Sequence, residues 1–402
     1  MTSRADGTEA TGYAYPWDFE GDPAAADRAA RLGLDRVALA AVYHATRAGT
    51  PLHPDHRIVD APWAATYLPV RDGDWRGRRL VPLEPAWTSR PNAFSAAQRQ
   101  LREHGLDVEA WVVLTHNLAL GRRNPDLVVR NAFGDAYSYG LCPAAPDVQE
   151  YCATLVRAVL TGATVSGIVL ESCGPMGLDH AGEHEKTEFA RWDEDARALL
   201  SLCFCRACSG RYQSAGIDVD RLRTSVRDGV DAGSALEEAL GSLAPAVAEV
   251  RTGIAADLRK LLVDQVRAVA PETRVTLHGS ADPWATGAFV TVQPALGDGI
   301  GAVVASCWEV GTGGQRIREL RTLLPGNVAV GAYLRLDREW NDGRKTRIRL
   351  QEYLEAGMRE LHLYHLGLLG TDGLQTLHDV VDTARHLAQS VAARRSTPGP
   401  GR

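Results

Sequence analysis

The sequence predicts an α/β fold, a (β/α)8 TIM barrel with long insertions after strands 2 and 4. Short apolar runs rich in Val, Ile, Leu and aromatic residues recur along the chain, separated by segments with helical periodicity. The runs do not alternate strictly between apolar and polar residues, which is typical of parallel strands covered on both faces. There are eight runs and no GxGxxG motif follows the first, so a barrel is favoured over an open doubly wound sheet. The expected strands are 13–17, 36–44, 109–117, 166–172, 274–279, 301–309, 327–336 and 360–369.

Helix signals lie between these runs. The stretch FSAAQRQLREHG has Ser95 as an expected N-cap and stops at Gly105. The stretch QRIRELRTLLPG ends on a Pro-Gly pair, which cannot continue a helix. Strands therefore alternate with helices, as a barrel of βα units requires.

One domain, residues 12–392, is expected to hold most of the chain. The polar ends, 1–11 and 393–402, are punctuated by Gly and Pro and are expected to be disordered. Two connections are far longer than ordinary loops: a loop insertion at 45–92 and a helical insertion at 173–272 that contains a cysteine cluster. Loops that follow barrel strands gather on the carboxyl-terminal face, so both insertions should line one pocket.

Composition excludes several classes of function. The chain has 402 residues, 45% of them hydrophobic, and a net charge of −6, so nothing favours a nucleic-acid or anionic-membrane partner. No apolar run approaches the roughly 18–20 residues that span a bilayer. The first residues lack the pattern of a secretory signal, so we expect a cytoplasmic protein. The expected partner is a small carbohydrate, and the chain could also form a homo-oligomer.

Polar and aromatic side chains end the predicted strands. In a barrel these ends meet on one face, and aromatic rings beside hydrogen-bonding groups suit a polyhydroxylated ligand such as a sugar. The candidate substrate-binding residues are Tyr15, Trp17, His44, His116, Asn117, Asp282, Trp308, Tyr333, Arg335 and His365.

Two carboxylates are the candidate catalytic groups. Glu171 directly follows a fully apolar strand in IVLESCG, and Glu309 has a similar position in VVASCWEVG. Glycoside hydrolysis needs one carboxyl group to protonate the leaving oxygen and a second as nucleophile or base. Asp282 is the rival for the second role, although it could equally cap a helix before Pro283. Either glutamate could instead cap a helix or pair with an arginine.

Three cysteines lie within six residues in SLCFCRACSGRY, at positions 203, 205 and 208. In a reducing compartment such a cluster favours a bound metal over disulfides. Unligated thiols on a helix are the alternative.

The order of motifs around Glu171 resembles glycoside hydrolase family 42, whose members are β-galactosidase-like (β/α)8 enzymes. A Cys-Pro in LCPAAPDVQEYC is followed by a strand that ends in Glu and then by C-x-C-x-x-C, over residues 139–210. The resemblance implies that Glu171 is the acid/base and that a structural zinc is bound by Cys142, Cys203, Cys205 and Cys208. Four thiolates would close a tetrahedral site. No organic cofactor is expected.

The sequence departs from that family at three points: the residue before Glu171, the end of strand 7, and the spacing from Glu171 to Cys203, which is longer than the family's. Leu170 stands where the family has Asn, and strand 7 offers no Glu in register. The segments VYHATRAG, LTHNLALG and NAFGDAYSYGLCP are similar, over most of the chain, to bacterial barrel proteins described only as glycoside-hydrolase-like.

Three functions remain open. The first is a glycoside hydrolase-like enzyme, a glycosidase with Glu171 as acid/base and Glu309 as nucleophile or base. The second is a sugar isomerase, epimerase or lyase on the same barrel, with proton transfer by His44, His116 and His365. The third is a carbohydrate-binding relative without catalysis.

Overall fold

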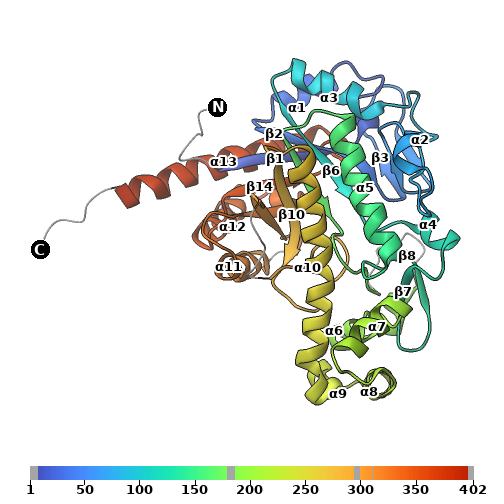
Figure 1. The fold of residues 1–402 in the computed structure, drawn as a ribbon. Helices are drawn as coiled ribbons and strands as arrows, with labels where there is room; N and C mark the ends of the chain where they lie inside the picture. Colours follow the sequence, from blue (N-terminus) through green and yellow to red (C-terminus); the bar gives the residue numbers. More distant parts are fainter. Residues whose placement is uncertain (1–7, 179–185, 294–298, 310, 397–402) are drawn as a thin grey trace, which may run out of the picture.

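A closed barrel of eight parallel strands forms the centre of the computed structural model, which describes residues 8–178, 186–293, 299–309 and 311–396 (Figure 1). Neighbouring barrel strands pair in parallel, and β1 pairs with both β2 and β14, which closes the ring. The predicted TIM barrel is therefore confirmed. Its strands are β1 (Glu9–Ala14), β2 (Arg36–Tyr43), β6 (Asp107–Val113), β9 (Gly167–Glu171), β10 (Arg274–Ser280), β12 (Ala302–Ser306), β13 (Ala329–Arg335) and β14 (Glu360–Tyr364).

The expected position of the first strand is wrong by four residues. β1 begins at Glu9 and ends at Ala14, and a 3-10 turn at Pro16–Asp18 follows it. Residues 9–11, which were expected to be disordered, pair with β14 and β2. These residues carry little apolar signal in the sequence. Backbone pairing and an ion pair between Glu9 and Arg36 hold them in the sheet.

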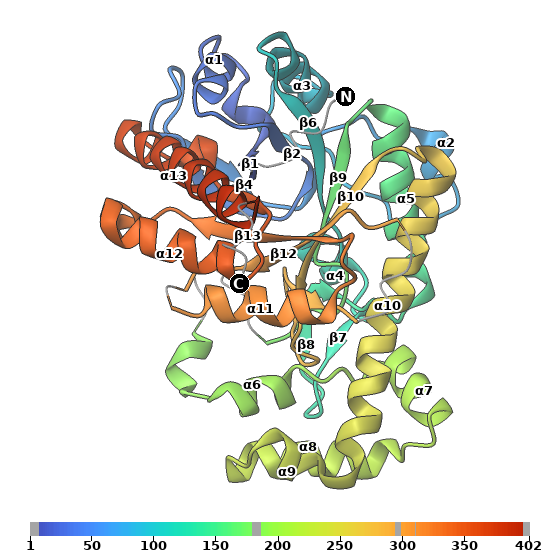
Figure 2. The same cartoon turned by 90° about the vertical axis from the view of Figure 1, so that its left-hand side faces the viewer.

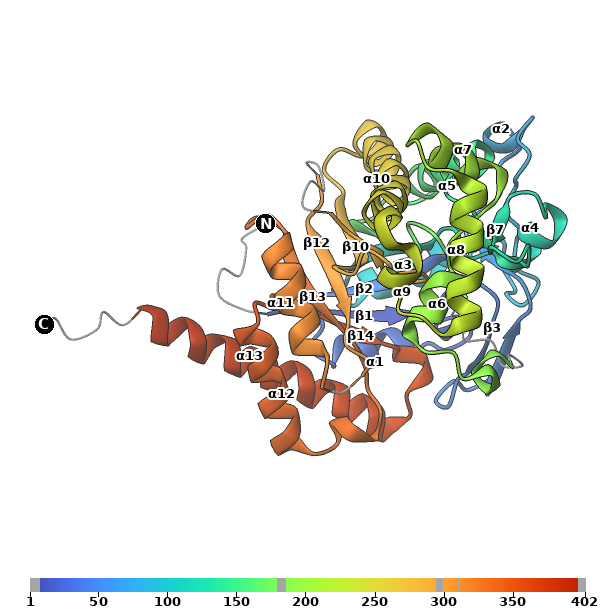
Figure 3. The ribbon, with the colours of Figure 1, turned by 90° about the horizontal axis from the view of Figure 1, so that it is seen from below.

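Helices surround the barrel (Figures 1 and 3). They are α1 (Ala25–Ala30), α3 (Ala93–Glu103), α5 (Pro146–Gly162), α10 (Ala244–Val269), α11 (Gly313–Leu323), α12 (Gly343–Glu355) and α13 (Thr371–Ser396). The N-cap of α3 is Asn92, whose Oδ1 accepts from Ser95 N, so this helix starts before the expected Ser95. α13 continues past residue 392, the expected end of the domain. Among the described helices, none combines the length and the apolar character needed to cross a bilayer.

The insertion after β2 has regular structure, where only a loop was expected. A hairpin of β3 (Thr46–Gly49) and β4 (Ile58–Ala61) is followed by β5 (Ala65–Thr66), which pairs antiparallel with β2. The short helix α2 (Asp72–Trp75) follows.

A further insertion, which the sequence did not predict, follows β6. It consists of α4 (Leu118–Arg123) and a hairpin of β7 (Val128–Arg130) and β8 (Ala136–Leu141). The hairpin turns at Gly134, which has a φ of 95°, and the Asn131 side chain binds the backbone N–H groups of Phe133 and Asp135.

The insertion after β9 builds a second hydrophobic core below the barrel. It holds α6 (Glu194–Leu200), α7 (Arg206–Ser214), α8 (Val219–Ala232) and α9 (Leu236–Leu240), which pack with the first half of α10 (Figure 2). The second half of α10 packs beside α5 on the barrel. One short strand, β11 (Val290–Thr291), extends the sheet beside β10. Short 3-10 turns also lie at Thr187–Ala190, Gly241–Leu243, Arg338–Trp340 and Leu366–Leu368.

Candidate active site and cysteine cluster

Glu171 ends β9 at the carboxyl-terminal mouth of the barrel, where the sequence placed it. Its side chain is 8% exposed. Oε2 accepts a 2.8 Å hydrogen bond from Nε1 of Trp111, on the neighbouring strand β6, and lies 3.4 Å from Nδ1 of His278 on β10. Oε1 has no hydrogen bond to any described residue, so it is the oxygen left to meet a ligand.

Burial raises the pKa of Glu171 to about 7, and the hydrogen bond from Trp111 lowers it in part. Four tyrosine hydroxyls interact electrostatically with this carboxylate, and no cation among the described residues does so. They belong to Tyr13, Tyr43, Tyr333 and Tyr364. A carboxyl group in such surroundings holds its proton near neutral pH, as a general acid must.

Aromatic side chains fill the mouth beside Glu171. The Tyr15 and Tyr364 hydroxyls are 3.1 Å apart, and the rings of Tyr15 and Trp17 stack at 4.3 Å. Tyr15 and Trp17 are each 1% exposed, so they form the floor of the mouth and not its accessible surface.

His365 and Asp18 lie at the edge of this floor. His365 Nδ1 is 3.8 Å from Asp18 Oδ2, which also accepts from Tyr15 N. Burial raises the pKa of Asp18 to about 7 and lowers the pKa of His365. Asp18 is thus a second buried carboxyl group whose raised pKa favours the protonated, neutral form. In the sequence Asp18 directly follows the expected first strand, but it was not among the candidate site residues; in the structure it lies four residues after β1, in the 3-10 turn.

The structure does not bring Glu309 into contact with Glu171. Glu309 lies three residues past the end of β12, its side chain is 71% exposed, and it pairs with Arg316 at 3.1 Å. The alternative interpretation, a glutamate paired with an arginine, is the one that the described contacts support. Sequence placed Glu309 at the end of a strand only because the apolar run GAVVASCWE is longer than the strand within it.

A cavity of about 460 Å³ opens between the ends of β10 and β12, and we call it the β10–β12 cavity. Asp282 lines it, with its Oδ1 accepting from Trp284 N. Phe289 also lines it, and the Phe289 ring stacks at 4.7 Å on His278, the neighbour of Glu171. The remaining side chains include Arg197, Ser280, Trp284, Ser306 and Arg316.

The ring of Trp308 stacks on Tyr333 at 5.8 Å, and the guanidinium of Arg335 lies 5.2 Å above Trp308. Tyr333 is buried, whereas Trp308 is half-buried and Arg335 exposed. The structure therefore brings these three candidate residues together, with Tyr333 deepest.

On the opposite side, His44 and His116 stack at 4.3 Å, and both are half-buried. Asn117 is 3% exposed, and its Oδ1 caps α4 by accepting from Leu120 N. That bond gives Asn117 a structural role as the N-cap of α4.

The four cysteines of the proposed metal site lie together and are buried, with all Sγ atoms within 4.8 Å of one another. Cys142 Sγ is 3.4 Å from Cys205, 3.5 Å from Cys208 and 3.9 Å from Cys203. Tetrahedral zinc with Zn–S bonds of about 2.3 Å would need sulfur atoms about 3.8 Å apart.

Backbone N–H groups donate hydrogen bonds to two of these sulfur atoms, which stabilises their thiolate form. Arg130 N and Cys205 N donate to Cys203 Sγ, and Cys208 N donates to Cys205 Sγ, at 3.5 Å each. Cys205 is the N-cap of α7, so it lies at the positive end of a helix. The residues therefore fit a closed, four-thiolate structural metal site. The other cysteines, at 152, 173 and 307, are buried apart from it.

Arg251 on α10 connects the cysteine cluster with the β10–β12 cavity. It is 5% exposed and donates to the carbonyl oxygens of Ser201 (3.3 Å) and Trp284 (2.9 Å), two residues that line the cavity. Burial lowers its pKa, and the nearby groups that oppose this include Cys208 and Cys203. Nothing in the sequence marked this arginine, because its partners are far from it along the chain.

No protein-family model matches the chain, and no curated protein is similar to it in sequence. Solved structures of glycoside hydrolases share its fold. The glycoside hydrolase domain of PgaB (BpsB) from Bordetella bronchiseptica has a TM-score of 0.58 and 15% identity, over 93% of this chain and 99% of that one. α-L-Fucosidase isoenzyme 2 from Paenibacillus thiaminolyticus has a TM-score of 0.55 and 12% identity, over 96% of this chain and 50% of that one.

A β-galactosidase from the psychrophilic Marinomonas ef1 is similar as well, with a TM-score of 0.54 and 12% identity, over 96% of this chain and 60% of that one. The chain thus spans about half the length of the fucosidase and three fifths of the galactosidase. At these identities the likeness concerns the (β/α)8 barrel alone.

Proposed function

We propose that the chain is a glycoside hydrolase-like enzyme in which Glu171 is the general acid/base. The observation that carries the proposal is the state of Glu171: a buried carboxyl group at the barrel mouth with a pKa raised to about 7. One oxygen is held by Trp111, and the other has no described partner. The neighbouring folds, all glycoside hydrolases, agree with this choice of chemistry.

The β10–β12 cavity is the proposed binding site for the glycoside. Glu171 is not one of its lining residues and adjoins it through His278, whose ring stacks on the lining residue Phe289. The volume of the cavity suits a small saccharide, and it offers an indole, a phenyl ring, hydroxyls and two arginines.

Asp282 is the proposed second carboxylate, because it lines the β10–β12 cavity just after β10, the strand that carries His278, whereas Glu194 and Glu319 line it from the helices α6 and α11. Glu309 reaches the edge of the cavity only through Arg316. A structural zinc held by the four cysteines is proposed to fix the insertion that carries α6 against the cavity.

The isomerase or lyase alternative is less well supported. It needs a histidine base that a substrate can reach, and His365 is 1% exposed. His44 and His116 remain at the rim.

The test is a mass-spectrometric screen of the purified protein against a panel of glycosides. Glu171→Gln, Asp282→Asn and Glu309→Gln are run beside wild type. Hydrolysis is expected for wild type and Glu309→Gln, with Glu171→Gln reduced by about 10²–10⁴-fold. A Glu171→Gln variant that keeps more than a tenth of the turnover refutes the assignment. A product of unchanged mass supports an isomerase, and saccharide binding without turnover supports a carbohydrate-binding protein.

A further inference from the structure

A chain of polar contacts crosses the barrel interior behind Glu171. His278 Nδ1 lies 3.4 Å from Glu171 Oε2, and His278 Nε2 is 2.9 Å from the hydroxyl of Tyr13. The same hydroxyl is 3.0 Å from His362 Nδ1, and His362 Nε2 is 3.3 Å from Glu360 Oε2. The strands β10 and β14 are separated by β12 and β13, so these contacts cross the barrel and do not run along one ladder.

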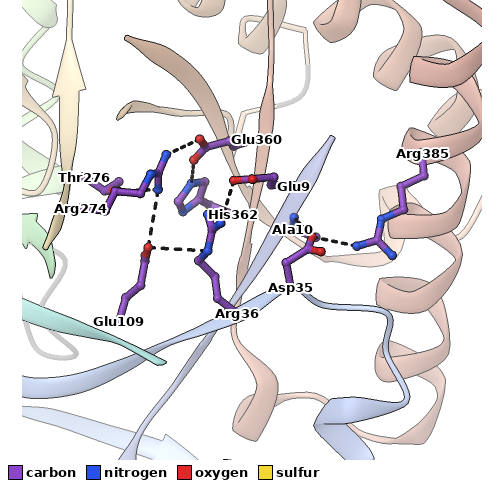
Figure 4. A network of polar contacts seen from close by, with 10 residues as sticks. All are labelled: Glu9, Ala10, Asp35, Arg36, Glu109, Arg274, Thr276, Glu360, His362 and Arg385. Atoms are coloured by element: carbon purple, nitrogen blue, oxygen red, sulfur yellow. Dashed lines mark hydrogen bonds and ion pairs between the residues drawn. The ribbon is translucent and has the colours of Figure 1, made fainter. Parts of the chain in front are cut away.

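The far end of the chain is anchored by charge (Figure 4). Arg274 pairs with Glu360 and lies 3.6 Å from Glu109, which is 3.7 Å from Arg36. Burial would raise the pKa of Glu360, but the hydrogen bond from His362 and the charges of Arg274 and Arg36 lower it to about 2. Glu360 is therefore a permanent carboxylate, which can only accept hydrogen bonds.

A fixed acceptor at one end sets the direction of every bond that follows. Glu360 accepts, so Nε2 of His362 must donate, and Nδ1 of a neutral His362 must then accept from Tyr13. The Tyr13 oxygen in turn accepts from Nε2–H of His278. Nδ1 of His278 is left with a lone pair, which faces Oε2 of Glu171 and has no hydrogen bond to any described residue.

We propose that His278 is a positioning residue that keeps Glu171 protonated, through a one-way hydrogen-bond chain that begins at Glu360 and passes through His362 and Tyr13. The lone pair on His278 Nδ1 disfavours a carboxylate at Glu171. A proton on Oε2 is donated to Nδ1, and a proton on Oε1 faces the mouth. The inference deepens the proposed function and rests on it only for the use of that proton as an acid.

The reverse direction needs an additional proton. His362 would have to be doubly protonated and paired with Glu360, so that its Nδ1–H donates to Tyr13, and Nδ1–H of His278 would then donate to Oε2 of Glu171. That state adds a charge on His362, which is completely buried. The groups that face Glu171 from the other strands are the phenols of Tyr13, Tyr43, Tyr333 and Tyr364, and none supplies a positive charge. Glu109 adds a negative charge near Tyr13.

Packing restricts the positions of the two imidazole rings. Gly331 on β13 faces His362, and a Cβ there would lie 2.9 Å from His362 Cδ2 and 3.1 Å from Nε2. The imidazole therefore occupies space that only a residue without a side chain leaves open. His278 is clamped between Tyr333 and Phe289, with ring distances of 4.8 and 4.7 Å.

The first test measures the wild-type protein itself. ¹⁵N chemical shifts of the imidazole nitrogens in the wild-type protein, assigned with His278→Gln and His362→Gln, report the tautomers directly. The expected result at pH 7 is a neutral Nε2–H tautomer for both histidines. An Nδ1–H tautomer of His278, or a doubly protonated His362, would overturn the proposal.

The second test measures the pKa of Glu171 by ¹³C NMR of the glutamate carboxyl carbons, assigned with Glu171→Gln. In Tyr13→Phe, His278 loses its acceptor and can turn Nδ1–H toward Glu171, which stabilises the carboxylate. The pKa of Glu171 should then fall by about one unit. Tyr43→Phe is the matched control, since Tyr43 is also a buried phenol that faces Glu171 but lies outside the chain.

Equal shifts in the two phenylalanine variants would refute the one-way chain. Neither measurement requires turnover. A protein that hydrolyses no glycoside can still confirm the chain, and a glycosidase with the wrong tautomers would refute the chain alone.

Discussion

Trp111 donates its indole N–H to Oε2 of Glu171 at 2.8 Å, between the neighbouring strands β6 and β9. Trp111 is 1% exposed, so the bond is made away from solvent and fixes which carboxyl oxygen faces inward. The strands pair in register at Val113 and Glu171, which puts Trp111 one layer deeper than the carboxylate that it binds. The orientation of the candidate acid is therefore built into the barrel.

The first prediction concerns stability against pH. The pKa of Glu171 is about 7 in the folded protein against an ordinary value of 4.5, so the folded state binds this proton more tightly than the unfolded state. Between pH 4.5 and 7 the wild-type protein should lose stability as pH rises, by at most about 3 kcal/mol from this group. Glu171→Gln cannot titrate, and urea unfolding at pH 4.5 and pH 8 should show that it loses less.

Glu309→Gln is the control for this experiment. Its carboxylate is exposed on the surface, so its stability should change with pH as wild type does. Identical pH dependence in Glu171→Gln and wild type would show that Glu171 is ionised at neutral pH in the folded protein.

The second prediction concerns metal. Wild-type protein purified without chelator should carry about one zinc per chain, and Cys208→Ser should lose it together with several kcal/mol of stability. Metal analysis by mass spectrometry and thermal unfolding measure the two effects. Cys307→Ala is the matched control, as Cys307 is buried and lies outside the cluster. Metal-free wild-type protein with four titratable cluster thiols would contradict the site.

The third prediction concerns Arg251. Replacing it by Met removes the donors that hold the carbonyls of Ser201 and Trp284, so the wall of the β10–β12 cavity should loosen. KM for the glycoside found in the screen should rise about tenfold, because one or two buried hydrogen bonds at the site are lost. Arg259→Met is the control: Arg259 is a buried arginine of the same helix that donates to Thr291 O instead. An equal rise in KM for both variants would assign the effect to general destabilisation.

The fourth prediction concerns the barrel interior. Gly331→Ala would put a methyl group 2.9 Å from the ring of His362, and the resulting overpacking should cost about 1–3 kcal/mol of unfolding free energy. Gly343→Ala, at the start of α12, meets no atom within 4 Å and should leave stability unchanged or slightly higher. Urea titration of the two variants checks both values. Equal stabilities would mean that His362 can move aside.

The sequence was informative where local pattern determines position. Eight apolar runs gave the eight barrel strands, and the spacing of Cys203, Cys205 and Cys208 marked a real cluster. Glu171 was found because it follows an apolar strand without a gap. The position of Glu309 was less well predicted, since Cys307 and Trp308 continue the apolar run after the strand has ended at Ser306.

Contacts made across the barrel could not be predicted. Tyr13 and His362 are 349 positions apart, and Tyr13 and His278 are 265 apart, so no spacing rule relates them. Each alone is an unremarkable buried aromatic residue. Their contacts depend on the closure of the barrel, which places inward-facing residues of distant strands in one layer.

Closure between β1 and β14 also governs how this protein is made. The first strand has its full set of neighbours only after the last strand has left the ribosome, so a growing chain holds β1 with one edge bare. The cysteine cluster needs only the segment from Cys142 to Cys208 and can assemble much earlier. Before β14 is synthesised, the chain would hold an open seven-stranded sheet. At this stage the chain would be most prone to aggregation and to binding by chaperones.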